Sequence, residues 1–191
     1  EGEYDECERA IQMLLREAGA EGIGYDLVSV VPDGFEAQAD WENLESPETY
    51  VGYEQARNFA SSDVAVLDES NTYAVPARLG LNSWALSGEW TIEKGASILN
   101  GPEGRIAFRF HARDVHLVMR SRTGGSVPFH VLVDGVPPGA AHGLDDDEDG
   151  HGTLVQPRLY QLVRQHGSIS DRTFEIAFLQ PGVEAYVFTF G

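Results

Sequence analysis

Cysteine is almost absent from this sequence, and its scarcity excludes two kinds of covalent chemistry. Cys7 is the only cysteine among the 191 residues. The chain therefore cannot form an internal disulfide, and it carries no Cys-x-x-Cys redox pair. With a single thiol, cysteine usage does not indicate the redox compartment.

Positive charge is also scarce. The chain has 13 basic and 31 acidic side chains, which gives a formal net charge of −18. A chain this acidic is repelled by polyanions, so nucleic acid and anionic membrane surfaces are excluded as partners on charge grounds. Function must therefore be sought among ligands that tolerate or prefer an acidic protein.

Long apolar runs are missing as well. No run approaches the ~18 apolar residues that a membrane-spanning helix needs. The chain opens EGEYDECERA, without a Met and without the charged-then-apolar pattern of a signal peptide. We therefore expect a fragment or a processed product.

The acidic charge that is present is distributed unevenly. Residues 1–50 hold 14 acidic and 2 basic side chains, whereas residues 51–191 hold 17 acidic and 11 basic ones. This asymmetry predicts two regions of different character. Apolar residues make up 42% of the chain, which is enough to bury a core.

Residues 3–18, EYDECERAIQMLLREA, are predicted to form one amphipathic helix. Its apolar stripe, spaced by three and four residues, comprises Cys7, Ala10, Ile11, Leu14, Leu15 and Ala18. Gly19 and Gly22 supply a stop signal. One helix cannot bury its own stripe, so we expect it to dock on the next domain or to pair with a second copy in a homodimer.

Residues 21–48 show no clear period and are predicted to form an acidic linker. The segment carries Pro and Gly among its acidic residues. Phe35, Trp41 and Leu44 indicate that parts of it pack down rather than remain free.

From about residue 50 the sequence changes to short segments of period two. Alternation predicts that Ile106, Phe108 and Phe110 share one face, as do Phe129, Val131 and Val133, Phe174, Ile176 and Phe178, and Tyr186, Phe188 and Phe190. Asp134-Gly135 is a turn signal. Roughly eight to ten strands without helices between them predict a mainly β protein, an antiparallel β-sandwich of jelly-roll type.

Several of these segments resemble a known family. The runs ETYVGYEQARNFAS, LNSWALSGEWTI, RIAFRFHARDVHLVM, PRLYQLVRQ and VEAYVFTFG are similar, in order over residues 48–191, to the C-terminal region of DipZ-type proteins. Those are membrane thiol–disulfide proteins related to cytochrome c biogenesis factors. Their DsbD-like membrane segment precedes a thioredoxin-like domain, and a sandwich similar to a carbohydrate-binding module comes last.

The resemblance implies an organisation for this chain. Residues 1–20 would be the last helix of the thioredoxin-like domain, residues 21–48 the linker, and residues 49–191 the sandwich. Cys7 does not match the family's redox pair, so no redox role is carried over. The resemblance also implies an extracytoplasmic location and the parent's thioredoxin-like domain as a partner.

A carbohydrate-binding sandwich needs exposed aromatic faces and a few planar polar groups. The candidates are Trp84, Trp90 and Tyr160, with Arg109, Arg158 and Gln161 as polar neighbours. The alternative for the aromatics is core packing, the usual place for them in sandwiches. The alternative for the arginines is a surface ion pair.

The run LDDDEDGHG, residues 144–152, offers a candidate calcium site. Asp145, Asp147 and Asp149 followed by Gly150 match the start of an EF-hand-type loop. The twelfth position holds Gln156 instead of a bidentate Glu, which favours the alternative of a hairpin turn with positive φ at its glycines. No cofactor is required, and calcium is the candidate ion.

No motif of catalysis is present. There is no G-x-S-x-G elbow, and the six histidines show no metal-ligand pair on a predicted helix. We therefore expect a non-catalytic accessory domain that binds cell-wall or glycoprotein carbohydrate. The alternative is a structural or protein-interaction domain that packs on the redox domain or on a second subunit.

Overall fold

The structure is a computed structural model that describes residues 4–20, 22–27, 39–61 and 64–191. It forms two compact units, Glu1–Gln38 and Ala39–Gly191. The elements are α1 (Tyr4–Glu17), β1 (Thr49–Tyr50), β2 (Ser70–Tyr73), β3 (Trp84–Ile92), β4 (Ser97–Phe110), β5 (Asp114–Ser121), β6 (Val127–Val133), a 3-10 turn (Gly139–Ala141), β7 (His151–Leu154), β8 (Arg158–Arg164), β9 (Arg172–Phe178) and β10 (Val183–Phe190). The predicted order of one helix followed by an antiparallel β-sandwich is confirmed.

The first unit contains α1, which ends where the sequence predicted. Gly19 adopts a φ of 81°, a conformation that costs glycine little, and the N–H of Ala20 closes the last turn on the Leu15 carbonyl at 3.0 Å. The stripe remains exposed, with Ile11 at 56% and Leu14 at 60%. Docking of α1 and homodimer formation therefore remain predictions. No helix in the described part of the chain is long and apolar enough to cross a membrane.

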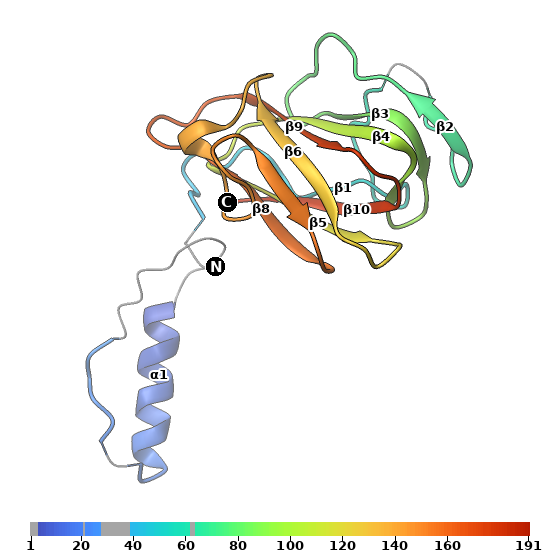
Figure 1. The fold of residues 1–191 in the computed structure, drawn as a ribbon. Helices are drawn as coiled ribbons and strands as arrows, with labels where there is room; N and C mark the ends of the chain where they lie inside the picture. Colours follow the sequence, from blue (N-terminus) through green and yellow to red (C-terminus); the bar gives the residue numbers. More distant parts are fainter. Residues whose placement is uncertain (1–3, 21, 28–38, 62–63) are drawn as a thin grey trace. The chain divides into compact units, whose positions relative to one another are not determined.

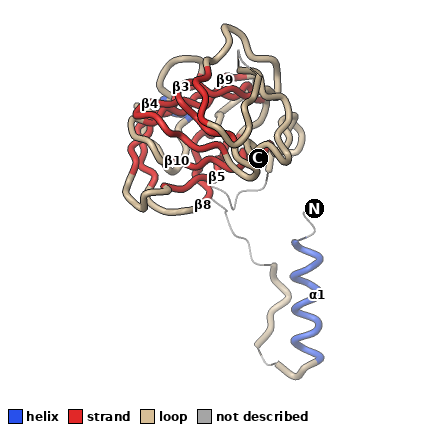
Figure 2. Tube along the Cα trace, turned by 90° about the vertical axis from the view of Figure 1, so that its right-hand side faces the viewer, coloured by secondary structure: helices blue, strands red, loops and turns tan. Residues whose placement is uncertain are grey.

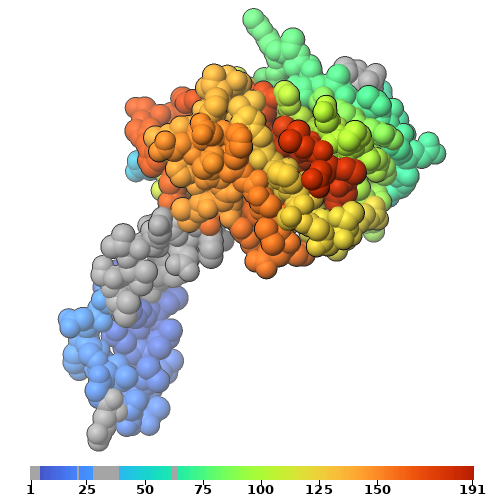
Figure 3. Space-filling view, viewed as in Figure 1, coloured from blue at the N-terminus to red at the C-terminus, as the bar shows by residue number. Residues whose placement is uncertain are grey.

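The second unit is a sandwich of two antiparallel layers, visible in Figures 1 and 2. One layer places β7, β6, β9 and β4 side by side and continues through β3 to β2, whereas the other contains β1, β10, β5 and β8. The long strand β4 joins the layers, because Ser97 and Ile98 pair with β10 while residues 104–110 pair with β9. In Figure 3 the red C-terminal segment accordingly lies between the lime and yellow segments.

Aromatic side chains fill the space between the layers. The rings of Phe108 and Phe174 meet the ring of Phe188 at centroid distances of 5.1 and 5.8 Å. Phe129 meets Tyr160 edge-on at 6.1 Å. Burying each ring stabilises the fold by about 1.5–3 kcal/mol. The residues predicted to form the inner faces of β4, β6 and β9 are all buried, so these predictions are confirmed.

The prediction for β10 is wrong at one residue. A bulge between Ala185 and Val187 turns the Tyr186 side chain away from Phe188. The Tyr186 hydroxyl instead donates to the Glu184 carboxylate at 2.6 Å. One extra residue in a strand moves the side chains that follow it to the opposite face of the sheet. A regular period-two pattern in the sequence does not show where such a bulge lies.

Part of the predicted linker packs on the sandwich unit. The backbone N–H groups of Glu45 and Ser46 donate to the His111 carbonyl, and Leu44 packs against the core. Trp41 is 55% exposed. Residue 21 and residues 28–38, including Phe35, lie outside the described residues. The predicted boundary at residue 49 remains a prediction.

Candidate functional site

The three aromatic residues predicted to form a sugar platform lie in the core. Trp84, Trp90 and Tyr160 are each 0% exposed. Their polar tips are satisfied internally, because the indole N–H groups of Trp84 and Trp90 donate to the carbonyls of Arg57 and Ser87, each at 2.8 Å. A fully buried ring cannot stack on a sugar. The structure therefore corrects the prediction of an exposed platform and gives these rings the alternative role, core packing.

Two of the predicted polar ligands meet a predicted calcium ligand instead. The Arg158 guanidinium donates to the Asp145 carboxylate in a two-pronged pair, with one contact of 2.9 Å. The backbone N–H of Gln161 donates to the same carboxylate at 2.7 Å. Asp145 thus fastens the acidic turn to β8, and the pairing raises the pKa of Arg158. Both carboxylate oxygens of Asp145 are therefore used in contacts that stabilise the fold.

The acidic run itself is a tight turn before β7. The Asp147 carboxylate accepts hydrogen bonds from the N–H groups of His151 at 2.8 Å and Asp149 at 3.1 Å, and these bonds lower the pKa of Asp147. Gly150 adopts the predicted positive φ, 83°. Gly152 does not, and it is needed for a different reason, since a Cβ there would lie 2.2 Å from the Phe129 ring.

The three predicted calcium ligands do not converge. In the described part of the chain no group of three or more His, Cys, Asp or Glu residues is arranged to hold a metal. Asp145 uses its carboxylate oxygens on β8, Asp147 accepts hydrogen bonds within the turn, and Asp149 is exposed. The geometry matches the alternative that the sequence offered, a hairpin turn. Calcium binding at Asp145, Asp147 and Asp149 remains a prediction.

Asp146 is the buried member of this run. It is 8% exposed, one carboxylate oxygen accepts the Gly143 N–H at 2.9 Å, and the other has no hydrogen-bond partner among the described residues. Burial raises the pKa of Asp146 to about 7, against an ordinary value of 3.8. The turn therefore holds a carboxyl group that titrates near neutrality.

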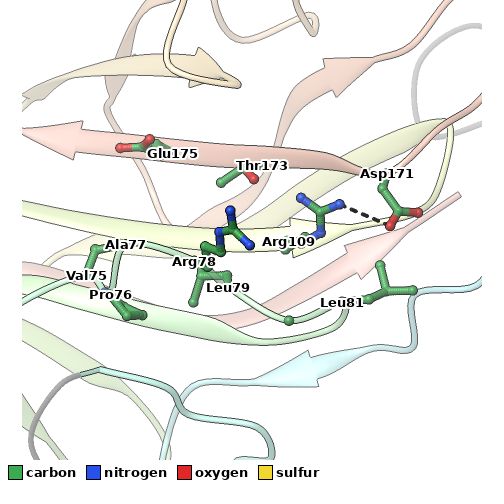
Figure 4. A pocket seen from close by; sticks show the side chains of 11 residues that line it. Val75, Pro76, Ala77, Arg78, Leu79, Leu81, Arg109, Asp171, Thr173 and Glu175 are labelled. Atoms are coloured by element: carbon green, nitrogen blue, oxygen red, sulfur yellow. Dashed lines mark hydrogen bonds and ion pairs between the residues drawn. The ribbon is translucent and has the colours of Figure 1, made fainter.

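An open pocket of about 560 Å³ lies on the outer face of the β4–β9 layer (Figure 4). Residues 75–81 form one wall, and Arg109 of β4 with Asp171, Thr173 and Glu175 forms the other. The strand register builds the second wall, because Arg109 is paired directly with Thr173. Among the predicted ligands only Arg109 lines this pocket.

The pocket carries balanced charges. Arg109 donates to the Asp171 carboxylate at 3.2 Å, and the Asp171 carboxylate also lies 2.7 Å from Nδ1 of His111. The hydrogen bonds from His111 and Arg109 lower the pKa of Asp171. Glu175 pairs with Arg105 at 2.7 Å. Arg78 is exposed and has no hydrogen-bond or ion-pair partner among the described residues.

In the described part of the chain, no hydroxyl or thiol group is hydrogen-bonded to the imidazole of the His111–Asp171 pair. The nearby Ser46 hydroxyl accepts the backbone N–H of His111 at 2.8 Å and donates to Asn82 at 2.7 Å. The hydroxyl therefore does not bond to the imidazole, and Ser46 is only 3% exposed. This geometry is not that of a hydrolytic triad, in which the base contacts the nucleophile.

Sequence reasoning missed most of the pocket. Arg78, Leu79 and the rest of the 75–81 wall carry no motif. Thr173 and Glu175 alternate with the buried Phe174 and Ile176, so the period-two pattern could have placed them outward on β9. It could not have shown that they face Arg109 across the strand pair.

Comparison with known proteins places most of the chain in one family. Residues 46–191 match the family model described as "Thioredoxin like C-terminal domain". The proteins named DipZ of Mycobacterium bovis and Mycobacterium tuberculosis are each 26% identical over 193 residues, covering 100% of this chain and 24% of the relative. The chain therefore spans about a quarter of the length of these relatives.

Among solved structures, a family two carbohydrate esterase from Clostridium thermocellum in complex with cellohexaose aligns with a TM-score of 0.39 and 14% identity, covering 51% of this chain and 27% of that chain. An active-site mutant of a family two esterase from the same organism gives 0.38 and 13% over the same shares. At TM-scores this low, the structural similarity does not support an inference about function.

Proposed function

The chain belongs to the family described as "Thioredoxin like C-terminal domain", and from this premise we propose that it is a non-catalytic accessory β-sandwich of an extracytoplasmic thiol–disulfide protein. We further propose that it binds carbohydrate in the pocket between residues 75–81 and the β4–β9 face. The resemblance to DipZ-type proteins supports the extracytoplasmic location.

The observation that carries the carbohydrate proposal is the mixture of donors and acceptors in the pocket. The guanidinium groups of Arg78 and Arg109 can only donate, whereas the carboxylates of Asp171 and Glu175 can only accept. Sugar hydroxyls do both, so a polyhydroxylated ligand can use all four groups. Two positive and two negative charges balance here, which disfavours a strongly charged ligand.

The non-catalytic part of the proposal rests on two observations. The sole cysteine, Cys7, lies exposed on α1 and cannot supply a dithiol pair. The His111–Asp171 pair lacks a hydrogen-bonded nucleophile in the described part of the chain. Any redox chemistry would therefore belong to the parent protein.

Calorimetric titration with a panel of soluble glycans and cell-wall fragments tests the proposal. Tryptophan fluorescence is a poor reporter, because Trp84 and Trp90 are buried away from solvent. We expect saturable binding to at least one glycan, weakened about tenfold by Arg78→Ala or Glu175→Gln, since each change removes a charged hydrogen-bonding group. Arg57→Ala is the matched control, because that side chain is exposed and its only hydrogen bond to a described residue goes to the neighbouring Ala56 carbonyl.

Two results would refute carbohydrate binding in this pocket. One is a flat titration with every glycan in the panel. The other is binding that Arg78→Ala and Glu175→Gln leave unchanged, which would place the ligand elsewhere. Parallel titrations with calcium and with a chelator show whether the acidic turn contributes.

One observation favours a second candidate, a protein-interaction domain. The pocket has no aromatic ring on which a sugar could stack, and its 75–81 wall presents the apolar residues Val75, Leu79 and Leu81. Such a wall suits a peptide or a domain surface. Titration with the thioredoxin-like domain of a parent protein, and the molar mass of the chain in solution, would separate the two candidates.

A further inference from the structure

Two histidines from neighbouring strands meet on the same outer face. His130 of β6 and His151 of β7 are direct cross-strand partners. Their rings lie 4.8 Å apart between centroids at an interplanar angle of 70°. Phe129 and Val131, which flank His130, and Leu154, at the end of the strand that begins with His151, belong to the core, so both histidines lie on strands anchored in it.

Each histidine has one ring nitrogen engaged with the same backbone carbonyl. Nε2 of His130 lies 2.9 Å from the Asp149 oxygen, and Nδ1 of His151 lies 3.3 Å from it. A carbonyl oxygen only accepts hydrogen bonds, so the nitrogen that faces it carries the proton. In each neutral ring the other nitrogen, Nδ1 of His130 and Nε2 of His151, then holds the lone pair.

Each ring therefore shares one feature with metal-binding histidines, an N–H fixed on a backbone carbonyl. A ligating imidazole usually donates its second N–H to a backbone carbonyl or a carboxylate, which fixes the tautomer and the ring orientation. Here the Asp149 carbonyl performs that role for both rings. Among the described residues, none forms a hydrogen bond with the remaining nitrogen of either histidine.

The surroundings favour a cation. His151 is exposed and His130 is half-buried, so an ion can reach both from solvent. The acidic turn, with exposed Asp147, Glu148 and Asp149, immediately precedes His151, and clustered carboxylates raise the local concentration of cations. Imidazole ligands select zinc, copper or nickel over calcium, which prefers oxygen.

We infer that His130 and His151 form a two-histidine site for a divalent transition-metal ion of the zinc class. Since no cluster of three or more candidate ligands is arranged for a metal in the described part of the chain, water completes the coordination and the ion is exchangeable. This inference is independent of the proposed carbohydrate binding, because neither histidine lines the pocket.

Calorimetric titration of the 191-residue chain with Zn²⁺ alone tests the site, starting from metal-free protein. We expect saturable binding with one ion per chain, weakened at least about tenfold by His130→Asn and by His151→Gln. His166→Gln is the matched control, because that exposed histidine lies in a different loop. Binding should also weaken in acid, because a protonated imidazole cannot ligate a metal ion.

Three outcomes would overturn the inference: no Zn²⁺ binding, binding that either histidine variant leaves unchanged, or equal loss in His166→Gln. Binding that disappears in Asp149→Asn but persists in His130→Asn would likewise assign the ion to the carboxylates. If a variant does not fold, the broadening of imidazole NMR signals by Ni²⁺ in the wild-type protein provides a second test of the site. Selective broadening of His130 and His151 supports the site, and uniform broadening of all six histidines contradicts it.

Discussion

Asp114 at the start of β5 and Asp146 in the acidic turn are both withdrawn from solvent, yet their pKa values move in opposite directions. They are 2% and 8% exposed. Burial acts to raise the pKa of Asp114, but hydrogen bonds from Arg164 and Arg113, both 2.7 Å long, outweigh it and lower the pKa. Among the described residues, the Asp146 carboxylate accepts only the Gly143 N–H, at 2.9 Å, and burial raises its pKa to about 7.

The difference shows that the partners of a carboxylate, more than its depth, decide whether it stays charged. The register of β5 and β8 pairs Asp114 directly with Arg164, so two strands of the framework fix that contact. Among the described residues, no arginine or lysine contacts the Asp146 carboxylate, whose oxygens have only the Gly143 N–H as a partner. Asp114 is therefore a fixed charge of the fold, whereas Asp146 is a titrating group in the turn beside the two histidines.

The largest effect is expected for Asp146→Asn, measured as a function of pH. The folded pKa of about 7 exceeds the ordinary 3.8, so the folded wild type binds a proton that the unfolded chain has lost. Wild-type stability therefore falls as pH rises from about 4 to about 7, by up to about 4 kcal/mol. The Asn variant lacks this decline, and its stability relative to wild type should grow with pH over that window.

Urea unfolding at several pH values, in the presence of a chelator, measures this difference. Glu148→Gln is the control, because it removes an exposed carboxylate from the same turn. A variant-minus-wild-type difference that stays constant between pH 4 and pH 8 would show that Asp146 is ionised in the folded protein. The neighbouring charges of His142, Asp145 and Asp147 act on the same group and are unchanged in the variant.

The next effect, of opposite sign, is expected for Asp114→Asn. The change leaves Arg113 and Arg164 without the buried carboxylate that both contact, and we expect a loss of about 2–3 kcal/mol at pH 7. The value lies below that for a fully buried pair, because each arginine side chain is 25% exposed. The folded pKa is lowered, so the wild type holds this stability above about pH 4 and loses it as the pH falls further.

Urea unfolding at pH 7 and at pH 3 checks this prediction. The variant and the wild type should differ clearly at the higher pH and converge at the lower one. Equal stabilities at pH 7 would mean that solvent replaces the carboxylate, and the contrast with Asp146 would then not reflect the arginine partners.

The sequence predicted those features of the fold that depend on local patterns. Period-two alternation is a local property, so it predicted the inward faces around Phe108, Phe129 and Phe174. The turn at Asp145–Gly150 was predicted from its Asp and Gly residues, which is also local information. The resemblance predicted the family. Alternation failed at Tyr186, where a bulge adds a residue that no local pattern shows.

The sites depend on contacts between distant segments, which alternation does not contain. Trp84 and Trp90 have the same sequence pattern whether their faces point to the core or to solvent. The pairing of His130 with His151, and of Arg109 with Thr173, depends on strand register. A shift of one residue would send either side chain to the opposite face. The sequence therefore predicted the strands, whereas the register between the strands determines which polar side chains lie next to one another.

A smaller effect is expected for Asp145→Asn, which tests how firmly the turn is held to β8. The Asp145 side chain is 13% exposed and accepts hydrogen bonds from Arg158 and the Gln161 N–H. Asn retains one acceptor, so we expect a loss of about 1 kcal/mol at pH 7. Urea unfolding measures it, with Glu148→Gln as the control. A loss as large as that of Asp114→Asn would mean that the turn is as much a part of the framework as β5.

The smallest effect on stability is expected for Asp171→Asn. Like Asp114, Asp171 has two basic partners, Arg109 and His111, but its side chain is 39% exposed at the rim of the pocket. Water can solvate Arg109 and His111 there when the carboxylate charge is lost. The melting temperature should therefore change by about 2 °C or less. Glycan binding should nevertheless weaken, because Arg109 loses the carboxylate that orients it. Thermal unfolding and calorimetric titration of the same sample separate the two readouts, and a large drop in melting temperature with unchanged binding would make Asp171 a structural residue like Asp114.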